Sequence, residues 1–226
     1  MRVYFLAVAT LIATEGSGFA QTENWYGRAS VGFGRPLAAS VDGEPVTALA
    51  EDGNFELDLS TGFSGALAVG RRWGDSPIRT EFEYRFIRSE LDEFVPADED
   101  SGSLSLPLPD NQRAIGHFIL AGATWDFDAT ERFRLYVGGA LGAANVNGLG
   151  DLALGVEFDD SSWEFAFQAR AGIGYGLTEK TSVGIDYAFV GTSDPDFSTT
   201  PAAGLESLNV GGLRVSTINF FVERAF

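Results

Sequence analysis

The spacing between strand-like segments constrains the fold of this chain more than any other feature. After residue 20, eight segments of about ten residues or more alternate apolar with small or polar side chains, as strands with two unlike faces do. The connections between these segments alternate between short and long without exception. The predicted strands are residues 25–34, 62–73, 78–86, 113–127, 133–144, 163–177, 182–190 and 214–226.

The order of the connections indicates a membrane barrel. The short ones are 74–77, 128–132 and 178–181. A soluble sandwich has no reason for this asymmetry, whereas a barrel with short turns on one side of a membrane and long loops on the other has it. The prediction is an all-β fold: an eight-stranded antiparallel transmembrane β-barrel with short periplasmic turns and long extracellular loops. The predicted long loops are residues 35–61, 87–112, 145–162 and 191–213.

Acidic residues concentrate in the long connections. The chain has 32 Asp and Glu against 15 Lys and Arg, a net charge of −17, and almost all of the excess lies in the long connections. Nucleic acid would be repelled by this charge, so no nucleic-acid partner is expected. The chain has no cysteine, which excludes disulfides, thiolate catalysis and zinc–thiolate sites.

The first twenty residues have the pattern of a secretory signal peptide. Arg2 precedes an apolar run at 3–14, and a stretch of small residues then ends at Ala20. The alternative is a buried N-terminal strand. We expect residues 1–20 to be the signal peptide and residues 21–226 to be the barrel domain.

The two faces of the predicted strands differ in chemistry. Bulky apolar side chains share one face, and charged residues, glycine and alanine share the other, so the first face is expected to meet lipid and the second to fill a narrow lumen. Buried charges must be paired, which predicts a structural ion-pair network in the lumen. Its predicted members are Arg28, Arg79, Glu81, Glu83, Arg85, Arg134, Glu164, Arg170, Asp186 and Glu223.

The motifs YVGGALGAA at 136–144 and ARAGIGYGLTEKTSVGIDYAF at 169–189, together with a terminal phenylalanine, resemble the small outer-membrane β-barrel family of Gram-negative bacteria. That family includes opacity-type surface antigens and the OmpA-like barrel. The resemblance implies an outer-membrane location and a last strand that the insertion machinery recognises. Residues Ile218, Phe220, Val222 and Phe226 match that insertion signal, whereas Arg224 stands where an aromatic residue is common.

Three candidate chemical sites have simpler structural explanations. His117, the only histidine, lacks the H-x-S pattern of lipid-A deacylase barrels because Ile119 stands in place of the serine. The pair Glu81 and Glu83 flanks arginines, as in an ion-pair network. The acidic run at 92–103 lacks the spacing of an EF-hand calcium loop, although weak binding of divalent cations there stays open. We therefore expect no enzyme activity, no cofactor and no metal site.

The expected role is structural or surface-interacting: envelope integrity, adhesion or surface antigenicity. Its expected partners are outer-membrane lipid, lipopolysaccharide, the insertion machinery and host or cell-surface ligands of the acidic loops. One alternative is a small ion-conducting porin, and another is a lipid-modifying outer-membrane enzyme. A barrel of this shape hosts unrelated functions, so the fold alone does not choose among them.

Overall fold

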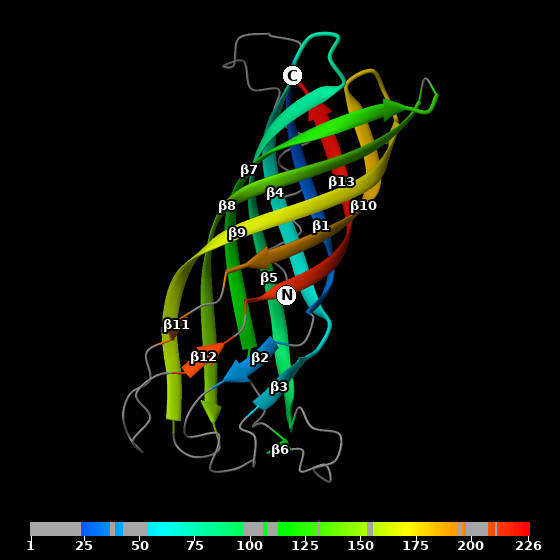
Figure 1. Cartoon of the computed structure of the whole chain (residues 1–226). Coiled ribbons are helices and arrows are strands. Elements are labelled where there is room, and N and C mark those ends of the chain that lie inside the picture. The colour runs from blue at the N-terminus through cyan, green and yellow to red at the C-terminus, as the bar shows by residue number, and fades with distance from the viewer. Residues whose placement is uncertain are drawn as a thin grey trace.

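The computed structural model is an elongated β-barrel (Figure 1), and every element it describes is a strand. The predicted signal peptide, residues 1–20, lies outside the described residues. No helix within the described ranges is long and apolar enough to cross a membrane. The structure describes residues 24–36, 39–42, 54–96, 106–107, 113–130, 132–152, 156–193, 196–197, 208–210 and 212–226.

Eight strands form the barrel wall, and all eight predicted segments are among them. Each pairs antiparallel with its neighbours, in the order β1, β4, β5, β7, β8, β9, β10, β13, and β13 pairs back with β1. Closure leaves no open edge, so the backbone amides of the wall can all be satisfied within it. The strands are β1 Trp25–Pro36, β4 Gly62–Arg72, β5 Ile78–Pro96, β7 Arg113–Asp128, β8 Phe133–Leu152, β9 Val156–Gly176, β10 Thr181–Thr192 and β13 Arg214–Ala225.

The short and long connections lie at opposite ends of the barrel, as predicted. The short turns after β4, β7 and β9 share one end with the C-terminus, at the top of Figure 1. Gly74, with φ of 55°, provides the left-handed residue that the turn between β4 and β5 requires. We call this the short-turn end.

Several segments predicted as loops are strands instead. β5 continues to Pro96, β8 continues to Leu152, and β9 begins at Val156. The sequence no longer alternates there, because 159–162 is a run of four polar residues, although the backbone pairing continues. Five short strands also lie within the long connections and pair with each other or with β5: β2 Ala39–Asp42, β3 Asn54–Leu59, β6 Leu106–Pro107, β11 Asp196–Phe197 and β12 Leu208–Val210.

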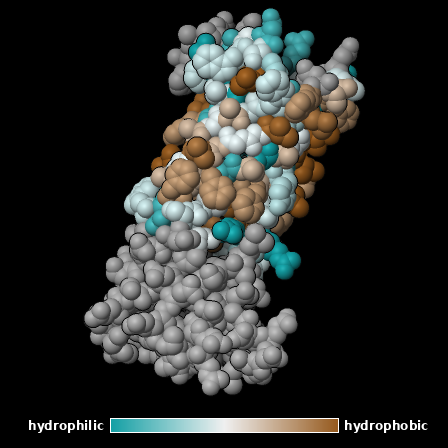
Figure 2. All heavy atoms as spheres, in the orientation of Figure 1, coloured by the Kyte–Doolittle hydropathy of each residue, from teal (hydrophilic) through white to brown (hydrophobic). Residues whose placement is uncertain are grey.

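Alternate side chains point to opposite sides of the wall. As predicted, most bulky apolar residues face outward and most charged residues of the wall face the lumen. Phe33 on β1 is 67% exposed on the outer face, whereas Tyr26 on the same strand is fully buried in the lumen. The space-filling view shows apolar side chains spread over the outer surface of the wall (Figure 2). The outer face is therefore suited to hydrocarbon.

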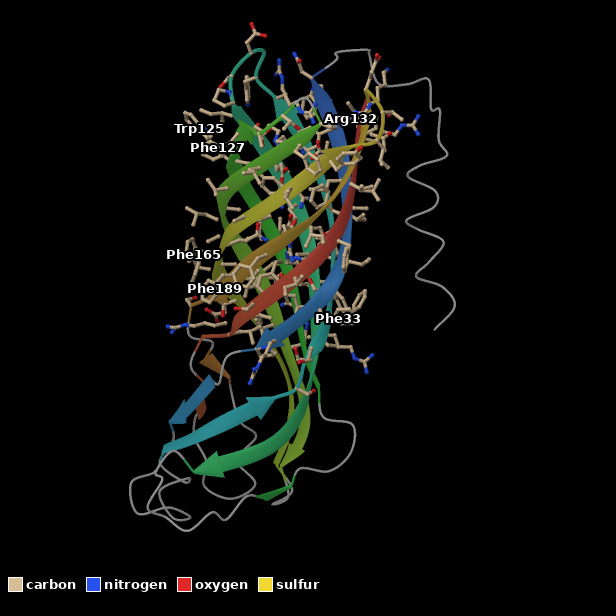
Figure 3. All side chains as sticks on the ribbon, turned by 90° about the vertical axis from the view of Figure 1, so that its right-hand side faces the viewer. Phe33, Trp125, Phe127, Arg132, Phe165 and Phe189 are labelled. Atoms are coloured by element: carbon tan, nitrogen blue, oxygen red, sulfur yellow. The ribbon has the colours of Figure 1, made fainter. Side chains whose placement is uncertain are left out.

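Aromatic side chains on the outer face lie toward both ends of the wall (Figure 3). Trp125 and Phe127 lie close to the short-turn end, and Phe33, Phe165 and Phe189 lie further down. This arrangement matches two girdles at the boundaries of a membrane.

Candidate functional site in the barrel lumen

The lumen near the short-turn end is organised around one carboxylate. Glu223 on β13 accepts hydrogen bonds from Arg72 Nη2 at 2.6 Å, Arg79 Nη1 at 2.8 Å and Arg134 Nη2 at 3.1 Å. These arginines come from β4, β5 and β8, so the contacts cross the lumen. Asp126 on β7 lies 2.7 Å from Arg79 Nε and supplies a second negative charge. Three cations therefore share two anions in a cluster that is mostly buried, with Arg72 the most exposed member at 35%.

A second cluster lies deeper along the lumen. Glu83 accepts hydrogen bonds from Arg85 Nε and Arg170 Nη1, both at 2.8 Å, and from Gln168 Nε2 at 2.9 Å. Arg170 also pairs with Glu81, so one guanidinium bridges both carboxylates of β5. The bidentate geometry of arginine suits this kind of planar bridge.

A third cluster joins β1, β8, β10 and β13. Arg28 pairs with Asp186, and its Nη2 also donates to Tyr136 Oη at 2.6 Å. Asn219 Nδ2 donates to Asp186 Oδ1 at 2.8 Å. The Arg28 guanidinium lies 3.8 Å from the centroid of the Phe221 ring, close enough for a cation–π contact.

Nine of the ten predicted network residues therefore lie in these clusters. Glu164 does not belong with them. It lies six residues before Arg170 on β9, about 20 Å along the strand, and accepts a hydrogen bond from Ser193 Oγ at 2.6 Å. The alternation of side chains correctly predicts that Glu164 points into the lumen. It does not predict how far along the barrel axis Glu164 lies from the other charged residues.

Sequence reasoning missed several members of the network. All of them occupy inward positions of their strands, so continuing the same alternation would have included them. Two of them are tyrosines whose hydroxyls bond to buried carboxylates, on the face that was expected to hold charged residues, glycine and alanine. The missed residues are Tyr26, Arg72, Asp126, Tyr136, Gln168 and Asn219.

An apolar layer fills the lumen beyond the ionic clusters, toward the long connections. Phe118 and Leu120 on β7 are both fully buried at its centre. The expected lumen filling of glycine, alanine and paired charges is therefore incomplete. The layer consists of Ile87, Phe118, Leu120, Ala144, Val146, Ala166, Ala188, Val190 and Val215, with Ala140 and Leu213 packed against it.

His117 lies on the outer face of β7, as its parity with Trp125 predicts. Its Nδ1 lies 2.7 Å from Tyr84 Oη, and its ring packs against Phe86 with the centroids 5.3 Å apart. These neighbours come from the facing strand β5 and make His117 part of an aromatic patch on the wall. No group of three or more His, Cys, Asp or Glu side chains within the described ranges could hold a metal ion. Residues 97–103 of the candidate calcium loop lie outside them.

The residues of the predicted insertion signal all point to the outer face of β13. Ile218 and Phe220 are each 56% exposed, and Phe226 follows the strand at the short-turn end. Phe226 N donates to the carbonyl of Trp25 at 3.0 Å, next to the seam between the first and last strands. The signal is therefore presented on one continuous outer surface.

Comparisons with known proteins agree with this architecture. The family model for the outer membrane protein beta-barrel domain matches residues 5–226. No curated protein matches the sequence. Among solved structures, the outer membrane protein OprG from Pseudomonas aeruginosa has a TM-score of 0.61 at 14% identity, covering 91% of this chain and 97% of that one.

Two further structures are similar at low identity. Neisserial surface protein A has a TM-score of 0.51 at 16% identity, covering 89% of this chain and 97% of that one. The outer membrane protease OmpT from Escherichia coli has a TM-score of 0.54 at 8% identity, covering 93% and 99%. At identities this low, the structural similarity shows a shared fold and nothing more. Proteins with this fold have unlike roles.

Proposed function

The chain belongs to the outer membrane protein beta-barrel family, and from that premise we propose that it is a closed barrel with a structural and surface-interacting role. It resides in the outer membrane of a Gram-negative bacterium. In this proposal the wall anchors the protein, and the long acidic connections meet partners outside the cell. The barrel itself carries no chemistry.

The main support for this proposal is that two layers of side chains fill the lumen. Guanidinium groups and carboxylates bridge the half near the short-turn end, and the apolar layer around Phe118 and Leu120 fills the other half. An ion crossing this lumen would have to break buried ion pairs and then pass a layer of packed apolar side chains. Both steps are costly, which favours a non-conducting barrel.

The composition of the long connections supports the surface role. Residues 87–112 alone contain seven acidic side chains against one basic side chain. Exposed loops on a rigid scaffold are a common place for binding residues. Their charge favours cationic partners, such as basic segments of host proteins, and disfavours anionic ones.

Planar bilayers test the closed state directly. The full chain, refolded and inserted, should give no resolved single-channel steps in 1 M KCl. A triple variant, Phe118→Ala with Leu120→Ala and Glu83→Ala, removes parts of both layers and should conduct if it folds. Regular steps from the wild-type protein would instead establish the small-porin alternative.

Whole cells test the surface role. Cells that display the wild-type protein should bind a fluorescent oligolysine peptide more strongly than cells that lack it. Replacing Asp98, Glu99 and Asp100 with their amides should reduce this binding. Equal binding by cells with and without the protein would contradict the proposed loop function.

A lipid-modifying or proteolytic activity is the remaining alternative, since one structural neighbour is a protease. Its test is His117→Ala, compared with the wild-type protein in the same cells. Unchanged lipid A, phospholipid and peptide-cleavage profiles are expected. Any profile that depends on His117 would overturn the non-catalytic assignment.

A further inference from the structure

A groove of about 490 Å³ is hollowed into the outer face of the wall. It crosses β1, β13, β10 and β9 and reaches the first residue of β8. Two rows of outward side chains, set side by side by the strand register, form its edges. One row is Ala29, Val222, Val183, Tyr175 and Phe133, and the other is Val31, Phe220, Ile185 and Ile173.

The floor of the groove is the row of residues between these two rows, whose side chains point into the lumen. Between the two rows, Gly174 and Gly184 are the inward residues of β9 and β10. A Cβ atom at Gly184 would clash with the carbonyl of Ile173 and with the ring of Phe221, which passes beneath it. Glycine at position 184 therefore lets the Phe221 ring pack against the backbone of β10 on the lumen side.

The groove slopes toward the short-turn end of the barrel. Ala29 is the fifth residue of β1, whereas Tyr175 is one residue from the end of β9 and Phe133 begins β8. The groove therefore opens at the periplasmic rim beside β8 and β9. The rings of Phe133 and Tyr175 lie 4.9 Å apart at this opening, as aromatic residues do at a membrane boundary.

Three cationic residues lie at the rim near this opening. Arg132 donates through Nη1 to Tyr175 Oη at 3.3 Å, which raises the pKa of the fully exposed guanidinium. Lys180 is exposed in the turn after β9, and its carbonyl accepts from Ala225 N at 2.8 Å. Arg224 faces outward on β13, opposite Thr181. The nearby turns also carry acids in the sequence: Glu179 lies between β9 and β10, and Asp128 and Glu131 shortly precede Arg132.

We propose that this groove binds one acyl chain of an anionic phospholipid of the inner leaflet, with the headgroup phosphate on Arg132. The volume lies within the range of about 300–1,000 Å³ that is usual for small-molecule sites. Arginine matches phosphate geometry, and charge-assisted hydrogen bonds strengthen at a partly desolvated boundary. Lys180 and Arg224 add attraction for a negative headgroup over a zwitterionic one.

Native mass spectrometry of the full chain, folded in detergent, tests the proposal with phosphatidylglycerol and phosphatidylcholine as probes. One phosphatidylglycerol molecule should be retained in preference to phosphatidylcholine. Arg132→Gln should weaken this retention about tenfold, as the loss of one charge-assisted hydrogen bond does. The control is Arg71→Gln, a rim arginine that stacks on Trp73 away from the groove and should leave retention unchanged.

A second pair of variants tests the groove itself. Ala29→Phe fills the hollow from its edge, whereas Ala121→Phe adds the same ring to the outer face of β7, away from the groove. Only Ala29→Phe should abolish retention, and heat-modifiable gel migration would establish that both variants fold. Equal retention of the two lipids, or wild-type retention by Arg132→Gln and Ala29→Phe, would overturn the proposal.

Discussion

Arg79 Nη1 lies 2.8 Å from Glu223 Oε2, so a residue near the start of β5 is tied across the lumen to a residue near the end of β13. Both side chains are almost completely buried. The pair spans 144 residues of sequence, and it sits at the centre of the cluster that closes the lumen at the short-turn end.

Glu223→Gln should destabilise the barrel by about 3–5 kcal/mol, because it removes the charge that three arginines share and leaves buried cations undercompensated. Urea unfolding in phospholipid vesicles would measure the change in the free energy of unfolding. Glu179→Gln, in an exposed turn, should change it by less than about 0.5 kcal/mol. Equal effects of the two variants would contradict a structural role for the network.

Phe118→Ala should cost about 3–5 kcal/mol, because it opens a cavity in the apolar layer. Its neighbour Ile119 points to the outer face and is 40% exposed, so acyl chains can fill the space that Ile119→Ala leaves. The same unfolding measurement should therefore give a smaller loss for Ile119→Ala. A larger loss at Ile119 would mean that the faces of β7 are reversed.

Gly172→Ala should destabilise the barrel and disturb the tyrosine contacts in the lumen. A Cβ atom there would come within 2.6 Å of Tyr136 Oη and 2.8 Å of Asp186 Cβ, so the Arg28 cluster would have to shift. Gly139→Ala is the matched control, since a Cβ atom there would lie 3.5 Å from the carbonyl oxygen of Gln168, an ordinary contact. Tyrosine fluorescence and thermal unfolding should change for Gly172→Ala alone.

Phe226→Ala should slow assembly into the outer membrane in cells without a comparable loss of stability in the purified barrel. The family resemblance assigns this residue to the insertion signal, and its ring is 46% exposed on the outer surface. Phe133→Ala, at a similar exposure on β8, should leave assembly unchanged. Gel migration measures the fraction of folded protein in isolated membranes. If this fraction were the same for both variants as for the wild type, the assignment of Phe226 to the insertion signal would be wrong.

The sequence predicts the wall of the barrel well, because one physical condition acts on it throughout. Lipid on one side and a packed lumen on the other require side chains to alternate between apolar and lumen-filling types along each strand. Arg28 is buried and Val31 exposed on β1, and Asn219 is buried and Phe220 exposed on β13. Beyond the wall, polar residues follow one another in the sequence, as at 159–162, so a period of two no longer marks a strand. The continuations of β5, β8 and β9 were therefore missed.

The sequence predicts which side chains face the lumen, but it does not predict their positions along the barrel axis. Alternation places Glu164 and Arg170 on the same side of β9, yet only the stagger between neighbouring strands decides which carboxylate meets which guanidinium. The apolar layer was missed for a related reason. Phe118 and Leu120 look like lipid-facing residues until the register of β7 shows that they share the inward face with Thr124.

The length of β8 and β9 has a consequence for what can reach the cell surface. Residues 145–152 continue β8 for about 26 Å beyond Ala144, and β9 remains paired with them from Val156 onward. The backbone pairing holds these residues in a two-stranded ribbon, in which Asp151 and Glu157 lie opposite each other. Both acids lie farther along the ribbon from Ala144 than the roughly 8 Å over which salt screens a charge, so their attraction for cationic molecules is largely independent of the charges nearer the wall.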